Sequence, residues 1–117
     1  MAEHVMKLHP GPFAKIKDGS KTIELRLYDE KRRRISLGDT IRFVNAANAT
    51  DTVCVCVRDL FIFGSFEELY QHLPLTECGY TAEEVHTASP RDMEMYYSKE
   101  EQTRCGVVGI RIALLPS

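Results

Sequence analysis

The chain has 117 residues, 44% of them hydrophobic and 27% charged, with a formal net charge of -2 at pH 7. These values are those of a soluble globular protein with one domain over residues 1–117, and the net charge argues against a strongly anionic partner. The first residues are too polar for a signal peptide and no apolar run approaches the roughly 18 residues of a membrane span, so we expect a cytoplasmic protein with no membrane contact.

The beginning of the chain predicts a strand, a helical turn and a second strand. Residues 4–9 form a brief apolar run typical of a strand. Pro12 suits the first turn of a short amphipathic helix, and Gly19 suits its left-handed end. Residues 21–28 then alternate apolar and polar side chains, which indicates a strand with one face toward the core.

The polar face of that second strand is the main candidate site. Ile23, Leu25 and Leu27 are expected to be buried, which places Thr22, Glu24, Arg26 and Tyr28 together on the opposite face, with Lys21 at the mouth of the strand. A flexible cation beside a carboxylate and a guanidinium can bind a ligand with an anionic group and a hydrogen-bonding base. A solvated face of a one-sided sheet shows the same alternation, so spacing alone leaves that alternative open.

A charged bend follows, and its most basic part is Lys31-Arg32-Arg33-Arg34. We interpret this run either as a hairpin edge that contacts phosphates or as a solubilising edge strand that repels other chains. Charge is uneven along the chain: residues 1–44 carry ten Lys or Arg against six Asp or Glu, and residues 45–117 carry five against eleven. A local basic surface is therefore compatible with the acidic total.

The rest of the chain predicts four more strands and several short helices. Residues 34–36 and 40–44 read as strands on either side of a turn, and residues 52–57 as a central strand that 61–63 extend. Short helices are predicted by the capping pairs Ser65 and Glu68, Thr81 and Glu84, and Ser98 and Glu101, and by the proline in Ser89-Pro90. A last strand over 106–114 completes an expected antiparallel meander. Strands at both ends with helices between them indicate an α+β fold whose mostly antiparallel sheet closes into a small β-barrel.

One stretch of the sequence is similar to a known family. The residues that carry the similarity are Lys7 to Phe13, Ile16, Gly19, Lys21, Glu24, Arg26 and Leu37-Gly38-Asp39. Together they resemble the ASCH (activating signal cointegrator homology) domains, which are related to PUA domains, and residues 96–101 and 106–110 resemble the closing helix and strand of such domains. The resemblance implies a PUA-like barrel with short helices flanking a cleft, the G-x-K-x-x-E-x-R motif at its edge, and RNA or a nucleoside as ligand.

The first functional hypothesis is a domain that binds RNA, a nucleotide or a nucleoside. Lys21 and Arg26 would contact phosphate or base acceptors, Glu24 would accept from a base amino group, and Tyr28 would stack on a base. Further candidate ligand-binding residues are Thr22, His9, Tyr97 and Ser98. For Ser98 the Glu101 partner favours helix capping, and for Tyr97 core packing is the alternative.

The second hypothesis is a small hydrolase with Lys21 and Glu24 as its catalytic residues. Some ASCH-like proteins are amidohydrolases of N4-acylated cytidines, using the motif lysine, a threonine three positions later and a more distant glutamate. Here Lys21 matches, but Glu24 stands at the threonine position, which removes the matched nucleophile, and Glu77 aligns only loosely with the distant acid. Other family members are proposed to cleave single-stranded RNA, a role for which Arg26 would add charge stabilisation. The departure at Glu24 favours binding.

We expect no metal and no cofactor. Cys54, Cys56, Cys78 and Cys105 form no C-x-x-C pair and have no zinc-finger spacing with a histidine, so buried free thiols are expected.

A third hypothesis is a protein-interaction domain with the acidic residues 45–117 as its interface.

Overall fold

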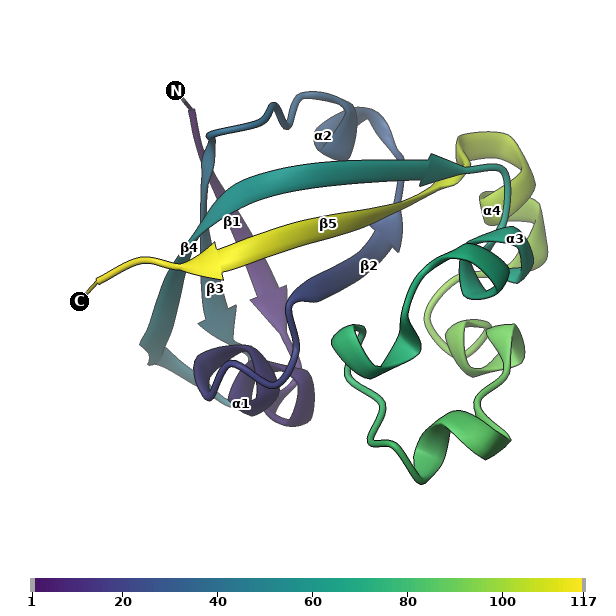
Figure 1. The fold of residues 1–117 in the computed structure, drawn as a ribbon. Coiled ribbons are helices and arrows are strands. Elements are labelled where there is room, and N and C mark those ends of the chain that lie inside the picture. Colours follow the sequence, from purple (N-terminus) through teal and green to yellow (C-terminus); the bar gives the residue numbers. More distant parts are fainter. Residues whose placement is uncertain (1, 117) are drawn as a thin grey trace.

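The computed structural model describes residues 2–116 (Figure 1). The strands are β1 (Glu3–Leu8), β2 (Ile23–Leu27), β3 (Thr40–Asn45), β4 (Asn48–Phe63) and β5 (Val107–Leu114). The α-helices are α1 (Pro10–Lys17), α2 (Glu30–Arg33), α3 (Phe66–His72) and α4 (Lys99–Cys105), and the 3-10 turns are η1 (Leu75–Glu77), η2 (Glu84–Thr87) and η3 (Pro90–Met93). No helix within residues 2–116 is long and apolar enough to cross a membrane.

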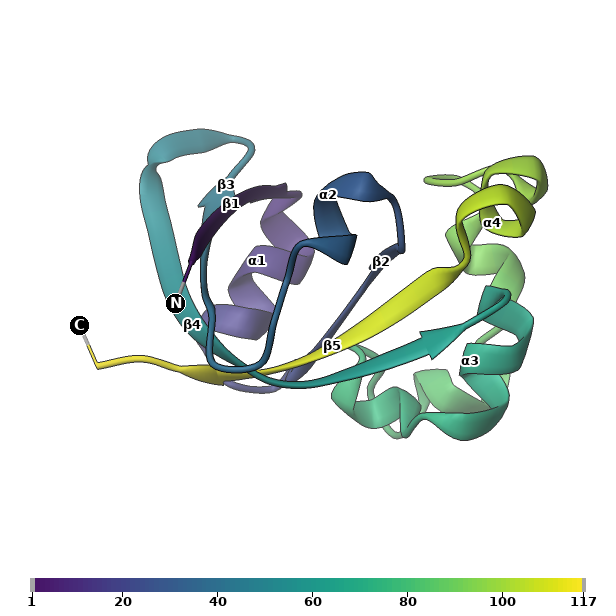
Figure 2. The ribbon, with the colours of Figure 1, turned by 90° about the horizontal axis from the view of Figure 1, so that it is seen from above.

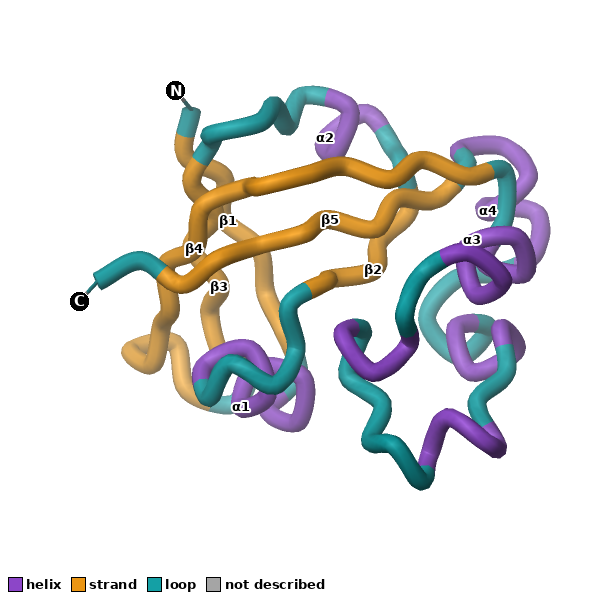
Figure 3. The backbone as a smooth tube through the Cα atoms, viewed as in Figure 1, coloured by secondary structure: helices purple, strands orange, loops and turns teal. Residues whose placement is uncertain are grey.

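The five strands form one sheet in the order β1-β3-β4-β5-β2. Only the pair of β1 and β3 is parallel, and the other three pairs are antiparallel. The sheet curls into a half-barrel, as the views in Figures 2 and 3 show, and β4 passes from β3 to β5 through a register shift between Val57 and Asp59. The predicted α+β class, the mostly antiparallel sheet and the central position of β4 are confirmed.

The predicted meander is wrong in its pairing. β2 lies against the last strand, β5, and β1 pairs with β3 across a connection that contains α1, β2 and α2. Residues 34–36 form no strand, and the basic run begins in a short helix, α2, that Asp29 caps through a bond from the Arg32 amide. Local alternation indicates that a segment is a strand, but which strand it joins depends on burial over the whole chain.

Helix ends follow the sequence signals closely. Ser98 accepts from the Glu101 amide and Glu101 accepts from the Ser98 amide, which is the predicted reciprocal cap of α4. Ser65 likewise caps α3 through the Glu68 amide. Thr81 and Glu84 form the expected capping bonds, and Ser89 forms a capping box with Asp92, but the segments after them form only 3-10 turns.

Two hydrophobic cores lie on opposite faces of the β2 and β5 part of the sheet. The inner core fills the half-barrel and includes Phe13 and Ile16 of α1. The outer core contains Ile23, Leu25 and Leu27, which are 0%, 6% and 6% exposed and pack against α3. The predicted burial of these three side chains is therefore correct, and the polar side chains between them face the inner side of the sheet.

Candidate functional site

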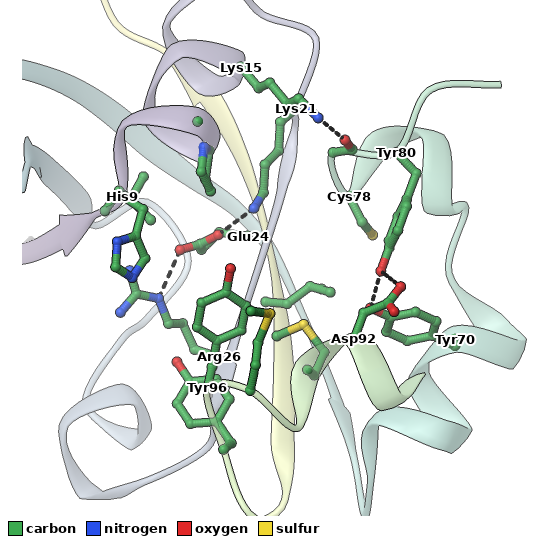
Figure 4. A pocket seen from close by; sticks show the side chains of 18 of the residues that line it. His9, Lys15, Lys21, Glu24, Arg26, Tyr70, Cys78, Tyr80, Asp92 and Tyr96 are labelled. Atoms are coloured by element: carbon green, nitrogen blue, oxygen red, sulfur yellow. Dashed lines mark hydrogen bonds and ion pairs between the residues drawn. The ribbon is translucent and has the colours of Figure 1, made fainter. Parts of the chain in front are cut away.

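A pocket of about 540 Å³ lies where the half-barrel meets the segment between α3 and α4 (Figure 4). One wall comes from the end of β1, the start of α1 and strand β2. The opposite wall comes from Tyr70 of α3 and from the irregular chain that includes Cys78 to Tyr80 and Asp92 to Tyr97. Segments far apart in the sequence thus form one concave site of the size that small molecules occupy.

Lys21, Glu24 and Arg26 form an ion-paired group at the base of this pocket. The Lys21 Nζ atom lies 2.8 Å from Glu24 Oε1, and Arg26 Nε donates to Glu24 Oε2 at 2.8 Å. The three side chains are 10%, 3% and 12% exposed, respectively. Burial disfavours the charged form of Glu24, but the two neighbouring cations outweigh it and hold the pKa of this carboxyl below its usual value. At neutral pH both carboxylate oxygens are engaged by cations.

Local sequence explains how the three groups meet. Glu24 and Arg26 are two residues apart on β2 and therefore share a face. Lys21 precedes the strand, and its amide donates to the carbonyl of Lys15 in α1. Gly79, with a φ of 107°, passes close to the Lys21 side chain, and a Cβ there would lie 3.2 Å from Lys21 Cδ. Position 79 therefore suits glycine both for its backbone conformation and for the space left to the lysine.

Aromatic side chains lie beside this charged group. The ring centroids of His9 and Tyr96 are 5.9 Å apart, and Tyr96 remains 49% exposed. Tyr97 also lines the pocket while its ring stacks on Phe66 of the outer core, with centroids 5.9 Å apart. Burial raises the pKa of Tyr97 against the opposing effect of Arg26, so its hydroxyl stays protonated at neutral pH.

A hydrogen-bonded chain forms the opposite wall. The hydroxyl oxygens of Tyr70 and Tyr80 are 2.6 Å apart, and the Tyr80 hydroxyl donates to Asp92 Oδ2 at 2.8 Å. Asp92 Oδ2 also accepts from the Ser89 amide at 3.1 Å. Burial raises the pKa of Tyr70 to about 12, and burial followed by the bond to Tyr70 raises that of Tyr80 further, so both phenols are neutral at physiological pH.

Two lysines stand at the border of the pocket. Lys15 of α1 donates to the Gly79 carbonyl at 2.6 Å and so ties the two walls together. Lys7 at the end of β1 is exposed, and within residues 2–116 its ammonium has no hydrogen-bond or ion-pair partner. It is therefore available to an anionic ligand.

The structure brings together five of the eight residues that the sequence nominates. Lys21, Glu24, Arg26, His9 and Tyr97 line the pocket, whereas Thr22, Tyr28 and Ser98 do not.

The three candidate residues that do not line the pocket have other contacts. The Thr22 hydroxyl donates to Glu77 Oε1 at 2.9 Å, Tyr28 lies under the Arg33 guanidinium at 4.5 Å, and Ser98 caps α4. Tyr28 packs against the inner core, which is the face that alternation predicts, but neither Thr22 nor Tyr28, at the two ends of β2, reaches the pocket.

The sequence analysis did not identify several residues that line the pocket, most of them on the wall opposite β2. The unpredicted lining residues with polar side chains are Lys7, Lys15, Tyr70, Tyr80, Asp92 and Tyr96. Lys7 and Tyr96 lie in the segments that resemble the ASCH family, which is a signal that could have identified them. Tyr80 and Asp92 carry no such signal, because they reach the pocket only through the packing of irregular chain.

The basic run has partners within the protein. Lys31 donates to the Val5 carbonyl at 2.8 Å, Arg32 pairs with Asp29, Arg33 donates to the Cys105 carbonyl, and Arg34 pairs with Glu30. Both interpretations placed this run on the edge of a hairpin, and that placement is wrong because the run forms α2 and the turn after it. Lys31 and Arg33 thus attach this segment to backbone elsewhere in the fold, and Arg32 and Arg34 pair within the segment.

Within the described residues no group of three or more His, Cys, Asp or Glu side chains could hold a metal ion. The four cysteines are free thiols, and burial raises the pKa of Cys78, which lines the pocket, to about 12. This thiol is therefore protonated and a poor nucleophile at neutral pH.

Comparison with known proteins supports the fold and the family resemblance. A family model described as the ASCH domain matches residues 6–116. The crystal structure of the hypothetical protein PH0355 is similar at 31% identity and a TM-score of 0.78, covering 98% of this chain and 100% of that one. The solution structure of PF0455 from Pyrococcus furiosus is similar at 32% identity and a TM-score of 0.70, covering 98% and 99%.

A third structure, ASCH from Zymomonas mobilis, is 16% identical with a TM-score of 0.64, covering 95% of this chain and 66% of that one, which shows a common fold alone. No curated protein matches the chain. The α+β, PUA-like fold that the sequence predicts is thus shared with solved structures.

Proposed function

The chain belongs to the ASCH domain family, and on this basis we propose that its pocket binds a nucleotide unit, either within single-stranded RNA or as a free nucleotide or nucleoside. The observation that carries the proposal is the pocket of about 540 Å³ that combines a buried Lys21–Glu24–Arg26 group with exposed aromatic rings. An unstacked nucleotide needs this combination, because it presents an anion, polar edges and a flat apolar face in one ligand.

Charge around the pocket favours an anion. The cations that line it are Lys7, Lys15, Lys21 and Arg26, and the carboxylates are Glu24 and Asp92. Because the cations are in excess and Lys7 is exposed, a phosphate at the border near Lys7 would meet positive charge without the cost of breaking the buried ion pairs. This local surplus exists although the whole chain has a net charge of -2.

The exposed aromatic rings supply a surface for a base. Tyr96 and His9 lie at the mouth of the pocket, and half of Tyr96 is open to solvent. Stacking of a base on an aromatic ring contributes on the order of 1–3 kcal/mol and tolerates any base. In this proposal, stacking provides affinity and the polar wall provides selectivity.

The geometry supports binding over hydrolysis. Glu24 is fully engaged by two cations and has a lowered pKa, which makes it a weak proton acceptor. The Thr22 hydroxyl is bonded to Glu77 outside the pocket and is not placed to replace the missing threonine nucleophile. The Lys21 side chain lies 2.8 Å from Glu24 Oε1 in a buried ion pair and is therefore engaged rather than free to act as a nucleophile.

The proposal is tested by equilibrium titration of 5′-mononucleotides and a short single-stranded RNA at several salt concentrations. Lys7→Ala should weaken RNA binding and reduce the magnitude of the salt slope by about 0.7 for one lost phosphate contact. Tyr96→Ala should weaken binding by about 1–3 kcal/mol. The matched controls, Arg34→Ala and Ile62→Ala, remove an exposed cation and an exposed apolar side chain that do not line the pocket and should change neither value.

Two outcomes would contradict the proposal. No binding of any nucleotide or RNA would remove it, as would equal losses in the pocket variants and their controls. Robust deacylation of N4-acetylcytidine that is lost in both Lys21→Ala and Glu24→Ala would instead identify an amidohydrolase in which a carboxylate replaces the hydroxyl.

A further inference from the structure

The hydrogen bonds between Tyr70, Tyr80 and Asp92 run in one direction. An ionised carboxylate has no proton, so Asp92 only accepts and the single Tyr80 hydroxyl proton is directed to Asp92 Oδ2. The short contact between the two phenols then requires Tyr70 to donate to the Tyr80 oxygen. The chain of donation is therefore Tyr70 to Tyr80 to Asp92.

This direction leaves the Tyr70–Tyr80–Asp92 chain with acceptors and no free donor. Both phenolic protons are used inside the chain, so each oxygen can only accept from a further group. Asp92 Oδ2 has two donors, Tyr80 and the Ser89 amide, whereas within residues 2–116 Oδ1 has none. All three side chains line the pocket, so a ligand meets phenolic oxygens and a carboxylate oxygen there.

We infer that this wall makes the pocket selective for a base with an exocyclic amino group over the matching base with an oxo group. The inference rests on the proposed function and names the ligand class of the same site. An amino group donates to the unused acceptors, whereas an oxo group turns its lone pairs toward them and leaves both sides without a proton. Glu24 does not supply this selectivity, because Lys21 and Arg26 occupy its two oxygens.

Reversal of the chain to serve an oxo base would cost a hydrogen bond within it. If Tyr80 turned its proton toward the ligand, Asp92 Oδ2 would lose its phenolic donor, and the short Tyr70 to Tyr80 contact would still consume one proton. A group of side chains that offers acceptors alone discriminates against a ligand edge that presents only acceptors.

The test uses two matched pairs of mononucleotides, cytidine against uridine monophosphate and adenosine against inosine monophosphate. Each pair has the same phosphate and sugar; it exchanges an amino for an oxo group and turns the neighbouring ring nitrogen from an acceptor into an N–H donor. We expect the amino member of each pair to bind at least about tenfold more tightly to the unmodified protein. Asp92→Asn keeps a carbonyl for Tyr80 and adds an amide donor, so the amino-to-oxo ratio should fall toward one, and Tyr80→Phe should lower it by freeing the Tyr70 proton.

Glu94→Gln is the control, because it neutralises an exposed carboxylate two residues away that pairs with Lys99 and does not line the pocket. Its amino-to-oxo ratio should equal that of the unmodified protein. Equal binding of both members of each pair, with affinity that still depends on Lys7 and Tyr96, would overturn the selectivity and leave the proposed function standing. A tenfold preference that persists in Asp92→Asn and Tyr80→Phe would also overturn it. Absence of binding by all four nucleotides would overturn the selectivity, and absence of binding by the short single-stranded RNA as well would overturn the proposed function itself.

Discussion

At the scale of single residues, Glu24 explains why two cations can be buried at the base of a pocket. Its carboxylate bonds both Lys21 and Arg26, and Arg26 Nη2 donates in addition to the Lys7 carbonyl at 2.8 Å. Such a group is stable as a unit because each charge has a partner, but removal of one member leaves another charge buried and unpaired. The pocket and the fold therefore depend on the same side chains.

Lys21→Ala should both destabilise the protein and weaken nucleotide binding. Loss of the ammonium leaves Glu24 with Arg26 alone, and breaking a buried pair costs about 3–5 kcal/mol. Denaturant unfolding and nucleotide titration of the same sample measure the two effects. Lys17→Ala is the control, because Lys17 pairs at the surface with Asp51 and should cost less than about 1 kcal/mol. Equal stability of the two variants would contradict the description of the buried group.

At the scale of elements, the free edge of β1 explains how the half-barrel is closed. β1 pairs only with β3, so its other edge presents unpaired backbone groups. Lys31 of α2 donates to the Val5 carbonyl, and Arg26 of β2 donates to the Lys7 carbonyl, each at 2.8 Å. Long cationic side chains thus bridge β1 and the β2 side of the sheet where no strand ladder does, which gives part of the basic run a structural role.

Lys31→Met should loosen the β1 edge. The substitution keeps an apolar stem but removes the donor to Val5, and a charged hydrogen bond near the surface contributes on the order of 1 kcal/mol. Hydrogen exchange of the β1 amides should become faster, and the denaturant midpoint should fall. Arg34→Met, which removes only the exposed pair with Glu30, should leave β1 exchange unchanged. The same acceleration in both variants would show that the edge bond is not responsible.

At the scale of the whole molecule, one carboxylate fastens the beginning of the chain to the turn before β3, the strand that pairs with β1. Asp39 accepts from the His4 ring at 2.8 Å, from the Ser36 amide at 3.0 Å and from the Ala2 amide at 3.2 Å. These bonds, led by that from His4, lower the pKa of Asp39 from 3.8 to about 2. Asp39 therefore couples the stability of the fold to acid.

The sign of this coupling follows from the lowered pKa. The Asp39 carboxylate stabilises the fold fully at pH values above about 4. This contribution is lost as the pH falls toward 2, because protonation of the carboxylate weakens its hydrogen bonds in the folded state. Asp39→Asn should therefore be less stable than the unmodified protein at neutral pH, and the difference should shrink between pH 4 and pH 2. Urea unfolding at a series of pH values measures the difference in unfolding free energy between the two proteins. A difference that is constant from pH 4 to pH 2 would contradict the assignment of the acid-sensitive bonds to Asp39.

The sequence by itself determined the local structure and one side of the pocket. Capping pairs located α3 and α4, Gly19 marked the end of α1, and alternation along residues 23–27 separated buried from pocket-facing side chains. These signals succeed because they depend on neighbours within about four residues. The motif around Lys21 also identified the ion-paired group.

Only the tertiary structure decided the strand partners, the helical form of the basic run and the second wall of the pocket. β2 pairs with β5, whose residues lie at least 80 positions later in the sequence. Tyr80 contacts Asp92 across a segment of 3-10 turns in which the sequence has no regular hydrophobic pattern. Such contacts arise because burial on both faces of the sheet must be satisfied at once, and no local pattern encodes that condition. The acceptor wall exists for the same physical reason, since the direction of its hydrogen bonds is set by which side chains the fold brings together.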